Sequence, residues 1–593
     1  MNLKNKSFSI LSIFLICFLG ILIYSNTFKV PFHFDDRRSI LENYSIRNIK
    51  NIKCIFNFCP NRFITYFSFA INYHLHQFHV FGYHLFNLII HLVTGIFVWW
   101  LVLLTFSTPV LARSECRRVK DEDRILSTKY YVPCTESRIS PTAIALFCAL
   151  LFIVHPIQTE SVTYIVQRAT SLATFFYIFS LCLYVKSRLS KFKISIINHQ
   201  VLSTKYHVPC YYIGSLLTAV LGMFTKQIVI TLPFMILLYE FFFLKDKTKK
   251  IDWKYITPFL LCSLIIPLTT IIMQKGNLSG LTKETETISR THYLLTQFRV
   301  LITYIRLLFI PINQNVDYDY PIIKSLWNIP VLSSAIFLVF ILFAGIFLFH
   351  RYRLISFSIF WFFLTISVES SIFPIRDVIF EHRLYLPSVG YSLFLATIFY
   401  YFFKKPKTGT TFLILITIVY SILTYKRNQI WKDEFTLWND TVKKSSNKPR
   451  PYVNRGLAYL NIGNFEKAIS DYKKALEIEP THADAYWGLG NIYYLKGEYK
   501  KSISEYSTAL KFKPDEPGIY YNRGLAYLKI GEIDKAISDW NSVLELNPFD
   551  IESYRNRAYA FFIKKDYKKA LQDIKKIQRL GFSIAPEFFK NFR

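Results

Sequence analysis

Two adjacent acidic residues, Asp35 and Asp36, are the first candidates for chemistry in this sequence. They stand in the segment Phe32-His33-Phe34-Asp35-Asp36-Arg37-Arg38, directly after the first long apolar run. A carboxylate beside a membrane surface can bind a divalent metal or act as general base toward a hydroxyl. The alternative is a solvated turn in which the acids pair with Arg37 and Arg38. The motif alone leaves both alternatives open.

Further ionisable side chains stand in short polar segments between apolar runs. The candidates are His155, Glu160, Arg168, Lys226, Glu381, His382 and Arg383. An ionisable group inside a span is costly unless it faces a partner or a wet cavity, which makes Arg168 a functional candidate, with snorkelling as its alternative. Arg and His can hold phosphate oxygens, while an ion pair between Glu381 and Arg383 is the structural alternative. If these segments converge, carboxylates stand beside cations, which suits transfer from a lipid phosphate to a hydroxyl.

The composition points to a membrane protein. Of 593 residues, 52% are hydrophobic and 19% are charged, with a net charge of +31. Ordinary soluble chains carry about 25% charged residues, and disordered or collagen-like chains are excluded. A basic chain can bind nucleic acid, but membrane proteins also collect Lys and Arg in their cytoplasmic loops. Because spans interrupt the basic loops, we expect no nucleic acid partner.

Eleven apolar runs are predicted to cross the bilayer as helices, since a hydrocarbon core about 30 Å thick needs about 20 apolar residues. They lie near residues 8–27, 82–105, 142–155, 162–185, 210–224, 228–244, 255–274, 330–350, 354–373, 386–403 and 409–425. Clusters of Lys and Arg place the N-terminus in the cytoplasm. The outer side then holds everything after residue 425 and the loops 28–81, 156–161, 275–329 and 374–385. The apolar stretch 297–312 must lie along the interface or re-enter from the outer side.

The C-terminal part repeats with a step of 34 residues. This step separates Tyr452, Tyr486, Tyr520 and Tyr554, and it also separates Pro480, Pro514 and Pro548. The spacing is typical of the tetratricopeptide repeat, whose helix pairs stack into a solenoid with a groove suited to an extended peptide. Candidates for lining this groove are Asn454, Asn522 and Arg523. The alternative is a structural spacer without a ligand.

The sequence therefore predicts an all-α chain with two main parts. A polytopic helical membrane domain covers residues 1–427, a linker covers 428–449, tetratricopeptide repeats cover 450–585, and a tail covers 586–593.

Ordered motifs along the chain resemble one family. They are Phe34-Asp35-Asp36, Asn61-Arg62-Phe63, Phe81-Gly82-Tyr83-His84-Leu85-Phe86-Asn87, His155-Pro156-Ile157-Gln158-Thr159-Glu160-Ser161-Val162, Gln167-Arg168, Thr225-Lys226-Gln227, Asp317-Tyr318-Asp319-Tyr320-Pro321 and Glu381-His382-Arg383-Leu384-Tyr385-Leu386-Pro387-Ser388. Together they resemble the transmembrane and tetratricopeptide-repeat-containing (TMTC-like) O-mannosyltransferases and their bacterial relatives, over nearly the whole chain.

The resemblance implies a GT-C-type glycosyltransferase that moves a sugar from a polyprenyl-phosphate donor to a protein hydroxyl on the outer side. It implies a catalytic acid at Asp35 or Asp36, with Asp36 as second choice, and donor-phosphate binding by His382 and Arg383, joined by Arg168. The remaining site candidates are His155, Glu160, Lys226 and Glu381. The resemblance implies no cofactor, and a divalent metal at the two acids stays an open alternative from the residues alone.

We expect the repeats to hold an acceptor protein or peptide near the bilayer. The expected location is the bacterial inner membrane with periplasmic repeats, or the endoplasmic reticulum membrane with luminal repeats in a eukaryote. The alternative function is a non-catalytic, membrane-anchored scaffold for protein assembly.

Two loops carry nearly the same eight residues, at 127–134 and 203–210, with seven of the eight positions identical. A translated DNA repeat inserted into cytoplasmic loops explains this better than a binding motif does. We expect both insertions to be dispensable.

Overall fold

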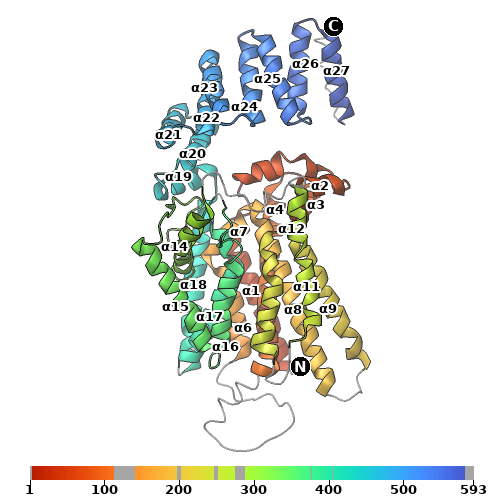
Figure 1. Cartoon of the computed structure of the whole chain (residues 1–593), viewed down its shortest axis with the longest axis vertical. Coiled ribbons are helices and arrows are strands. Elements are labelled where there is room, and N and C mark those ends of the chain that lie inside the picture. The colour runs from red at the N-terminus through yellow and green to blue at the C-terminus, as the bar shows by residue number, and fades with distance from the viewer. Residues whose placement is uncertain are drawn as a thin grey trace, which may run out of the picture. The chain divides into compact units, whose positions relative to one another are not determined.

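The computed structural model describes residues 3–111, 140–196, 202–245, 251–273, 288–375, 377–403 and 405–580. They divide into two compact units, residues 1–433 and 434–593. The regular elements of the described ranges are helices, so the predicted all-α class is confirmed (Figure 1).

The first unit is built from long helices joined by short helical turns. Its long helices are α1 (Leu3–Tyr24), α3 (Phe63–His76), α4 (Val80–Phe106), α6 (Pro141–Val154), α8 (Arg168–Ile196), α9 (Leu202–Met223), α14 (Arg290–Phe309), α15 (Ile329–Leu348), α16 (Arg353–Ile366), α17 (Pro387–Phe402) and α18 (Pro406–Ile430). The shorter elements are η1 (Arg37–Leu41), η2 (Tyr44–Arg47), α2 (Ile52–Phe58), η3 (Pro60–Arg62), η4 (Pro156–Gln158), α7 (Thr159–Thr163), η5 (Ile165–Gln167), η6 (Gln227–Thr231), α10 (Leu232–Tyr239), η7 (Glu240–Leu244), η8 (Trp253–Tyr255), α11 (Thr257–Cys262), α12 (Ile265–Met273) and η9 (Glu381–Leu384).

Seven stretches of described helix are long and apolar enough to cross a membrane, and an eighth arises if α6 and the bent segment after it form one broken span. The chain is therefore a multi-pass membrane protein. Helices occupy the place of every predicted span. At 354–373 and 386–403 they are α16 and α17, of 14 and 16 residues, and at 210–224 only the part Val208–Met223 of α9 is apolar. The stretch 297–312 belongs to α14, which is not among the candidate spans.

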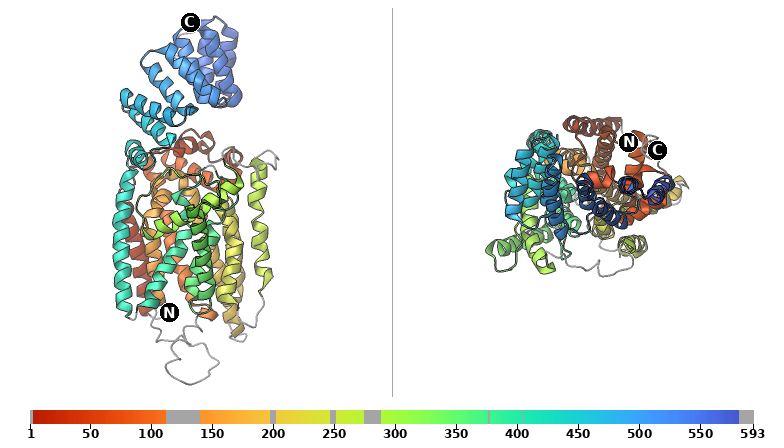
Figure 2. Two further views of the ribbon diagram at one scale, coloured as in Figure 1. Left: turned by 60° about the vertical axis from the view of Figure 1, so that its left-hand side comes forward. Right: turned by 90° about the horizontal axis from the view of Figure 1, so that it is seen from above.

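The core of the first unit lies around α4, α6 and α8, whose apolar side chains are mostly buried. In α1, α15 and α18, by contrast, most residues of the apolar stretch are not buried inside the protein. In a bilayer such apolar faces contact lipid, because the helix satisfies its own backbone hydrogen bonds. The long helices run side by side, and α2 and α3 lie at the end opposite the N-terminus of α1 (Figures 1 and 2).

The structure differs from the sequence prediction at two connections. The repeated segment 203–210 belongs to helix α9, which contains Pro209, whereas a loop was expected; its copy at 127–134 lies outside the described residues. The predicted linker 428–449 contains the end of α18, the whole of α19 (Glu434–Lys444) and the start of α20. Helix therefore occupies most of the segment that the sequence predicts as a linker.

The second unit consists of stacked antiparallel helix pairs, as the 34-residue step predicts. After α19 come α20 (Pro449–Asn461), α21 (Phe465–Ile478), α22 (Ala483–Leu495), α23 (Tyr499–Phe512), α24 (Pro517–Lys529), α25 (Ile533–Leu546), α26 (Ile551–Ile563) and α27 (Tyr567–Arg579). The turns between paired helices use Gly463, Gly497 and Gly531 at φ of 76° to 80°, a backbone conformation that side chains disfavour. The Tyr472 ring packs so closely on Gly488 that an added Cβ would lie 2.3 Å from it.

Candidate active site

The adjacent acids Asp35 and Asp36 point to different environments. Phe34, at φ of 45°, turns the backbone just before them. Asp36 is buried, and its carboxylate accepts hydrogen bonds from the backbone N–H of His33 at 3.0 Å and of Val166 at 2.7 Å. Asp35 is exposed, and its backbone N–H donates to the Tyr164 hydroxyl at 2.8 Å. The exposed carboxylate is therefore the one accessible to a substrate.

Trp431 fixes this turn from the end of α18. Its carbonyl oxygen lies 2.7 Å from His33 Nε2, and its indole stacks on Tyr164 with ring centroids 5.4 Å apart. Burial lowers the pKa of His33 to about 4, so the ring is neutral and donates this bond. Burial also raises the pKa of Asp36 to about 8, against the opposing effect of its two backbone donors. The loop that carries Asp35 is thus held from both sides.

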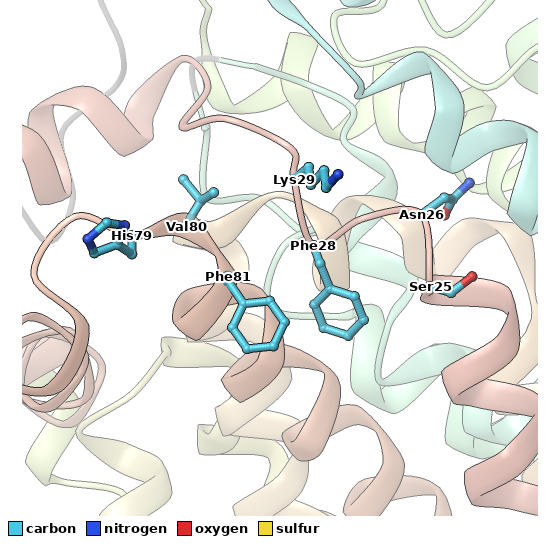
Figure 3. A pocket seen from close by; sticks show the side chains of 7 residues that line it. All are labelled: Ser25, Asn26, Phe28, Lys29, His79, Val80 and Phe81. Atoms are coloured by element: carbon cyan, nitrogen blue, oxygen red, sulfur yellow. The ribbon is translucent and has the colours of Figure 1, made fainter.

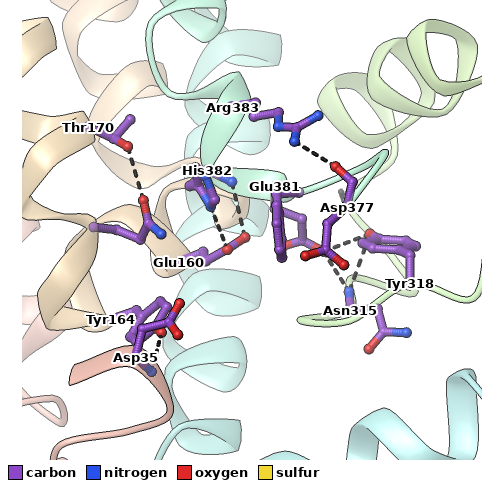
Figure 4. A network of polar contacts seen from close by, with 12 residues as sticks. Asp35, Glu160, Tyr164, Thr170, Asn315, Tyr318, Asp377, Glu381, His382 and Arg383 are labelled. Atoms are coloured by element: carbon purple, nitrogen blue, oxygen red, sulfur yellow. Dashed lines mark hydrogen bonds and ion pairs between the residues drawn. The ribbon is translucent and has the colours of Figure 1, made fainter. Parts of the chain in front are cut away.

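Glu160 and His382 form a buried pair. The Glu160 carboxylate accepts from the His382 backbone N–H at 3.0 Å and lies 2.7 Å from ring Nδ1 (Figure 4). Burial lowers the pKa of His382, and the charge of Lys226 adds to this effect. The neutral ring then donates Nδ1–H to Glu160, and Nε2 carries a lone pair. Within the described ranges no other residue bonds to this Nε2.

Lys226 and Glu369 form a second buried pair beside the first. The ammonium lies 2.9 Å from the Glu369 carboxylate and 3.0 Å from the Thr170 hydroxyl. Glu369 stands three residues beyond the end of α16. Burial alone would raise the pKa of Glu369, but the charges of Lys226 and Arg383 outweigh it and lower the pKa to about 2. This pair is therefore ionised.

Glu381 and Arg383 do not pair with each other, contrary to the structural alternative drawn from their spacing. Arg383 donates to the carbonyl oxygens of Asp377 at 2.7 Å and Val378 at 3.1 Å. Glu381 accepts from the backbone N–H of Asn315 at 2.5 Å, and its other contacts are the side chains of Gln314 and Tyr318. Both side chains are buried. Glu381 fastens the segment after α16 to the loop before α15, whereas Arg383 bonds within its own segment.

Arg168 and His155 lie deeper in the unit, and both are fully buried. The Arg168 guanidinium donates to Asn87, Asn72, Ser68 and the Tyr83 carbonyl, all neutral acceptors. His155 Nε2 lies 2.8 Å from the Leu308 carbonyl, and its Nδ1 accepts from the Ile157 N–H. These contacts brace α4, α8 and the bend after α6, and they leave the predicted substrate roles of the two residues untested.

The predicted candidates from separate loops therefore gather at one end of the first unit. Tyr164 lies within electrostatic range of both Asp35 and Glu160. The charge of Lys226 likewise acts on Glu160 and His382. Figure 4 shows Asp35, Tyr164, Glu160 and His382 in one neighbourhood. The sequence motifs did not single out Tyr164 or Trp431, and no sequence signal marks contacts that join positions 129 and 398 residues apart.

A cavity of about 590 Å³ lies between the end of α1 and the start of α4. It is lined by Ser25, Asn26, Phe28, Lys29, His79, Val80 and Phe81 (Figure 3). None of the predicted site residues lines this cavity. We therefore place the reaction at the cluster of Asp35, Tyr164, Glu160 and His382. Among the described residues, no group of three or more His, Cys, Asp or Glu side chains is arranged to hold a metal ion. The metal at Asp35 and Asp36 stays a prediction.

Comparison with known proteins gives the same resemblance over most of the chain. The chain is 23% identical to "Protein O-mannosyl-transferase F38B6.6" of Caenorhabditis elegans, covering 81% of this chain and 64% of the relative. It is 22% identical to human "Protein O-mannosyl-transferase TMTC3" (79% and 52%) and 24% identical to Drosophila melanogaster "Protein O-mannosyl-transferase Tmtc3" (82% and 57%). The resemblance to the TMTC-like family is confirmed. The chain spans about half to two thirds of the length of these TMTC-like relatives.

The repeats match separately. A family model described as "TPR repeat" matches residues 456–497 and 490–531, and one described as "Tetratricopeptide repeat" matches residues 517–550. The solved structure "MamA 41-end from Desulfovibrio magneticus RS-1" is 23% identical, with a TM-score of 0.23, covering 25% of this chain and 83% of that chain.

Two of the three predicted groove residues have partners inside the repeats. Arg523 forms a two-point ion pair with Asp539 at 2.9 and 2.7 Å, and it also donates to Ser507. The Asn522 amide donates to Asn491 in the preceding repeat at 2.9 Å. The Asn454 amide nitrogen is buried without a hydrogen bond in the described ranges. Arg523 therefore holds its own repeat together, and binding of an acceptor by these residues stays a prediction.

Proposed function

We propose that this chain is a membrane glycosyltransferase that moves a sugar, with mannose as first candidate, from a polyprenyl-phosphate donor to a protein hydroxyl. The similarity to proteins named O-mannosyl-transferases supports this reaction class. One observation carries the proposal: an exposed acid, Asp35, lies in the same neighbourhood as two buried pairs from distant loops. The pairs are Lys226 with Glu369 and His382 with Glu160.

In the proposed step, the Asp35 carboxylate takes the proton of a Ser or Thr hydroxyl. The hydroxyl oxygen then bonds to the anomeric carbon of the sugar. The bond between that carbon and the phosphate oxygen breaks, and the phosphate leaves with the electron pair as polyprenyl phosphate. General base catalysis suits Asp35, because it is exposed while its backbone is fixed by Tyr164.

The leaving phosphate gains negative charge in this step, and prearranged cations stabilise such charge. His382 is the candidate with an available ring nitrogen, since Nδ1 is held by Glu160. Its neutral ring becomes a cation and a donor to the phosphate once Nε2 takes up a proton. Arg383 and Arg168 contribute positive potential, although their guanidinium groups bond to other parts of the chain. The outer face, periplasmic in a bacterium, is the proposed side of the reaction, with the repeats holding the acceptor.

Sugar transfer from polyprenyl-phosphate mannose to a Ser-containing peptide in proteoliposomes tests this function. We expect Asp35→Asn to lower the transfer rate about a hundredfold or more, the range typical of a lost general base. Glu42→Gln, a surface acid of the same loop, is the matched control and should transfer at the wild-type rate. Equal rates for Asp35→Asn and wild type would contradict the role of Asp35. Peptide binding without any transfer by the wild type would favour the scaffold.

A further inference from the structure

Arg62 is a cation at the site end of the first unit with unused hydrogen-bonding capacity. Its side chain is half-buried, and within the described ranges its guanidinium makes no hydrogen bond or ion pair. Two buried cations there are engaged: Arg383 with backbone carbonyls and Lys226 with Glu369. An Arg has five donors and no acceptor, so a guanidinium partly withdrawn from water favours an anionic partner.

The backbone fixes Arg62 beside Lys226. Arg62 ends η3, and α3 begins at the next residue. The Ile64 N–H donates to the Phe224 carbonyl at 3.1 Å, and the Thr65 hydroxyl donates to the Thr225 carbonyl at 3.4 Å. Two contacts thus tie the start of α3 to the turn that leads into Lys226. The charge of Arg62 also acts on the side chains of Lys226 and His382.

Tyr66 connects Arg62 with the exposed acid. The hydroxyl of Tyr66, one turn into α3, lies within electrostatic range of both Arg62 and Asp35. Arg62 therefore lies in the same neighbourhood as the exposed carboxylate, and its charge also reaches His382. A donor whose anomeric carbon approaches Asp35 carries its phosphate one bond away from that carbon. An unpaired cation next to the acid is the group that such a phosphate meets.

We propose that Arg62 binds the phosphate group of the lipid donor and of the lipid phosphate product, an inference that rests on the proposed function. The planar guanidinium presents two parallel N–H groups to two phosphate oxygens. Breakage of the bond to the anomeric carbon leaves that oxygen with the electron pair, and the phosphate changes from one negative charge to two. Arg62 then holds the product more tightly than it holds the donor.

Binding of a polyprenyl monophosphate to the full chain in nanodiscs tests the inference without requiring transfer. We expect Arg62→Gln to weaken binding roughly ten- to hundredfold, the effect of losing charged hydrogen bonds. Arg62→Lys should be intermediate, since it keeps the charge but loses the planar fork. Lys53→Gln, an exposed cation of the same outer loop, is the control and should bind like the wild type.

Polyprenol, which lacks the phosphate, and phosphatidic acid, which lacks the prenyl chain, are the two comparison ligands. Arg62→Gln should leave polyprenol binding unchanged, whereas a misfolded variant would lose both ligands together; in that event Arg62→Lys supplies the comparison. Equal polyprenyl phosphate affinity in Arg62→Gln and wild type would overturn the inference, as would stronger binding of phosphatidic acid. Arg62-dependent binding with no sugar transfer by the wild type would instead overturn the proposed function alone.

Discussion

Glu160 holds His382 at two points, through the backbone N–H at 3.0 Å and ring Nδ1 at 2.7 Å. This arrangement orients the ring and leaves Nε2 as its only titrating position. Because burial lowers the pKa of His382, the ring is neutral at pH 7 before a ligand binds. A phosphate dianion next to Nε2 would favour the charged ring and so raise that pKa.

Binding of polyprenyl phosphate should therefore take up a proton. Its affinity should rise as the pH falls from 8 to 6, by at most about tenfold per pH unit for a single proton. His382→Gln should flatten this dependence to that of the phosphate itself. Dissociation constants at pH 6, 7 and 8 in nanodiscs check the prediction. Identical pH dependence in wild type and His382→Gln would show that the ring does not face the phosphate.

Asp36→Asn should lower the free energy of unfolding by about 1 to 3 kcal/mol. The new Asn side chain has one oxygen only, so its NH2 group faces one of the two backbone N–H donors, those of His33 and Val166. Asp35→Asn should cost almost nothing, since Asp35 is exposed. Thermal unfolding in detergent distinguishes the two variants. The pKa of Asp36 is raised to about 8, so its stabilising contribution is complete below its ordinary range near pH 4 and is lost as the pH rises through 8. The difference between wild type and Asp36→Asn should shrink accordingly between about pH 4 and pH 8 and stay constant above pH 8.

Lys226→Met should destabilise the chain by about 3 to 5 kcal/mol, because it leaves the Glu369 carboxylate buried without its cation. Adding Glu369→Met should recover part of this loss, since both charges are then removed. The unfolding temperatures of the single and double variants give the comparison. A double variant less stable than Lys226→Met would mean that Glu369 has another essential partner.

Arg523→Ala should destabilise the repeat formed by α24 and α25, because Arg523 is paired with Asp539 inside that repeat. Its effect is then not limited to weaker peptide binding. We expect a loss on the order of 1 to 3 kcal/mol. Hydrogen exchange in the full chain should then accelerate in α24 and α25. Lys535→Ala, which removes an exposed ion pair with Glu532, is the control and should leave exchange unchanged.

Periodic features of this chain could be predicted from the sequence. The 34-residue step located the paired helices, and apolar runs located a helix at each predicted span. Periodicity failed where the deciding contact is remote. No residue near Asp36 in the sequence indicates that the backbone N–H of Val166, 130 positions away, donates to its carboxyl group. Likewise the spacing of Glu381 and Arg383 favoured a local pair, but carbonyls and side chains from other segments bind both.

The turn at Phe34 makes the two neighbouring acids non-interchangeable. A residue with a side chain adopts a positive φ only at an energetic cost, and here that conformation directs one carboxylate outward and the next inward. Asp35 and Asp36 therefore cannot replace each other, since one is exposed and the other is buried. Inserting or deleting one residue before Asp35 would exchange their environments, leaving the exposed acid at a different distance from the membrane. The length of this turn, as much as its chemistry, therefore decides which of the two acids a substrate can reach.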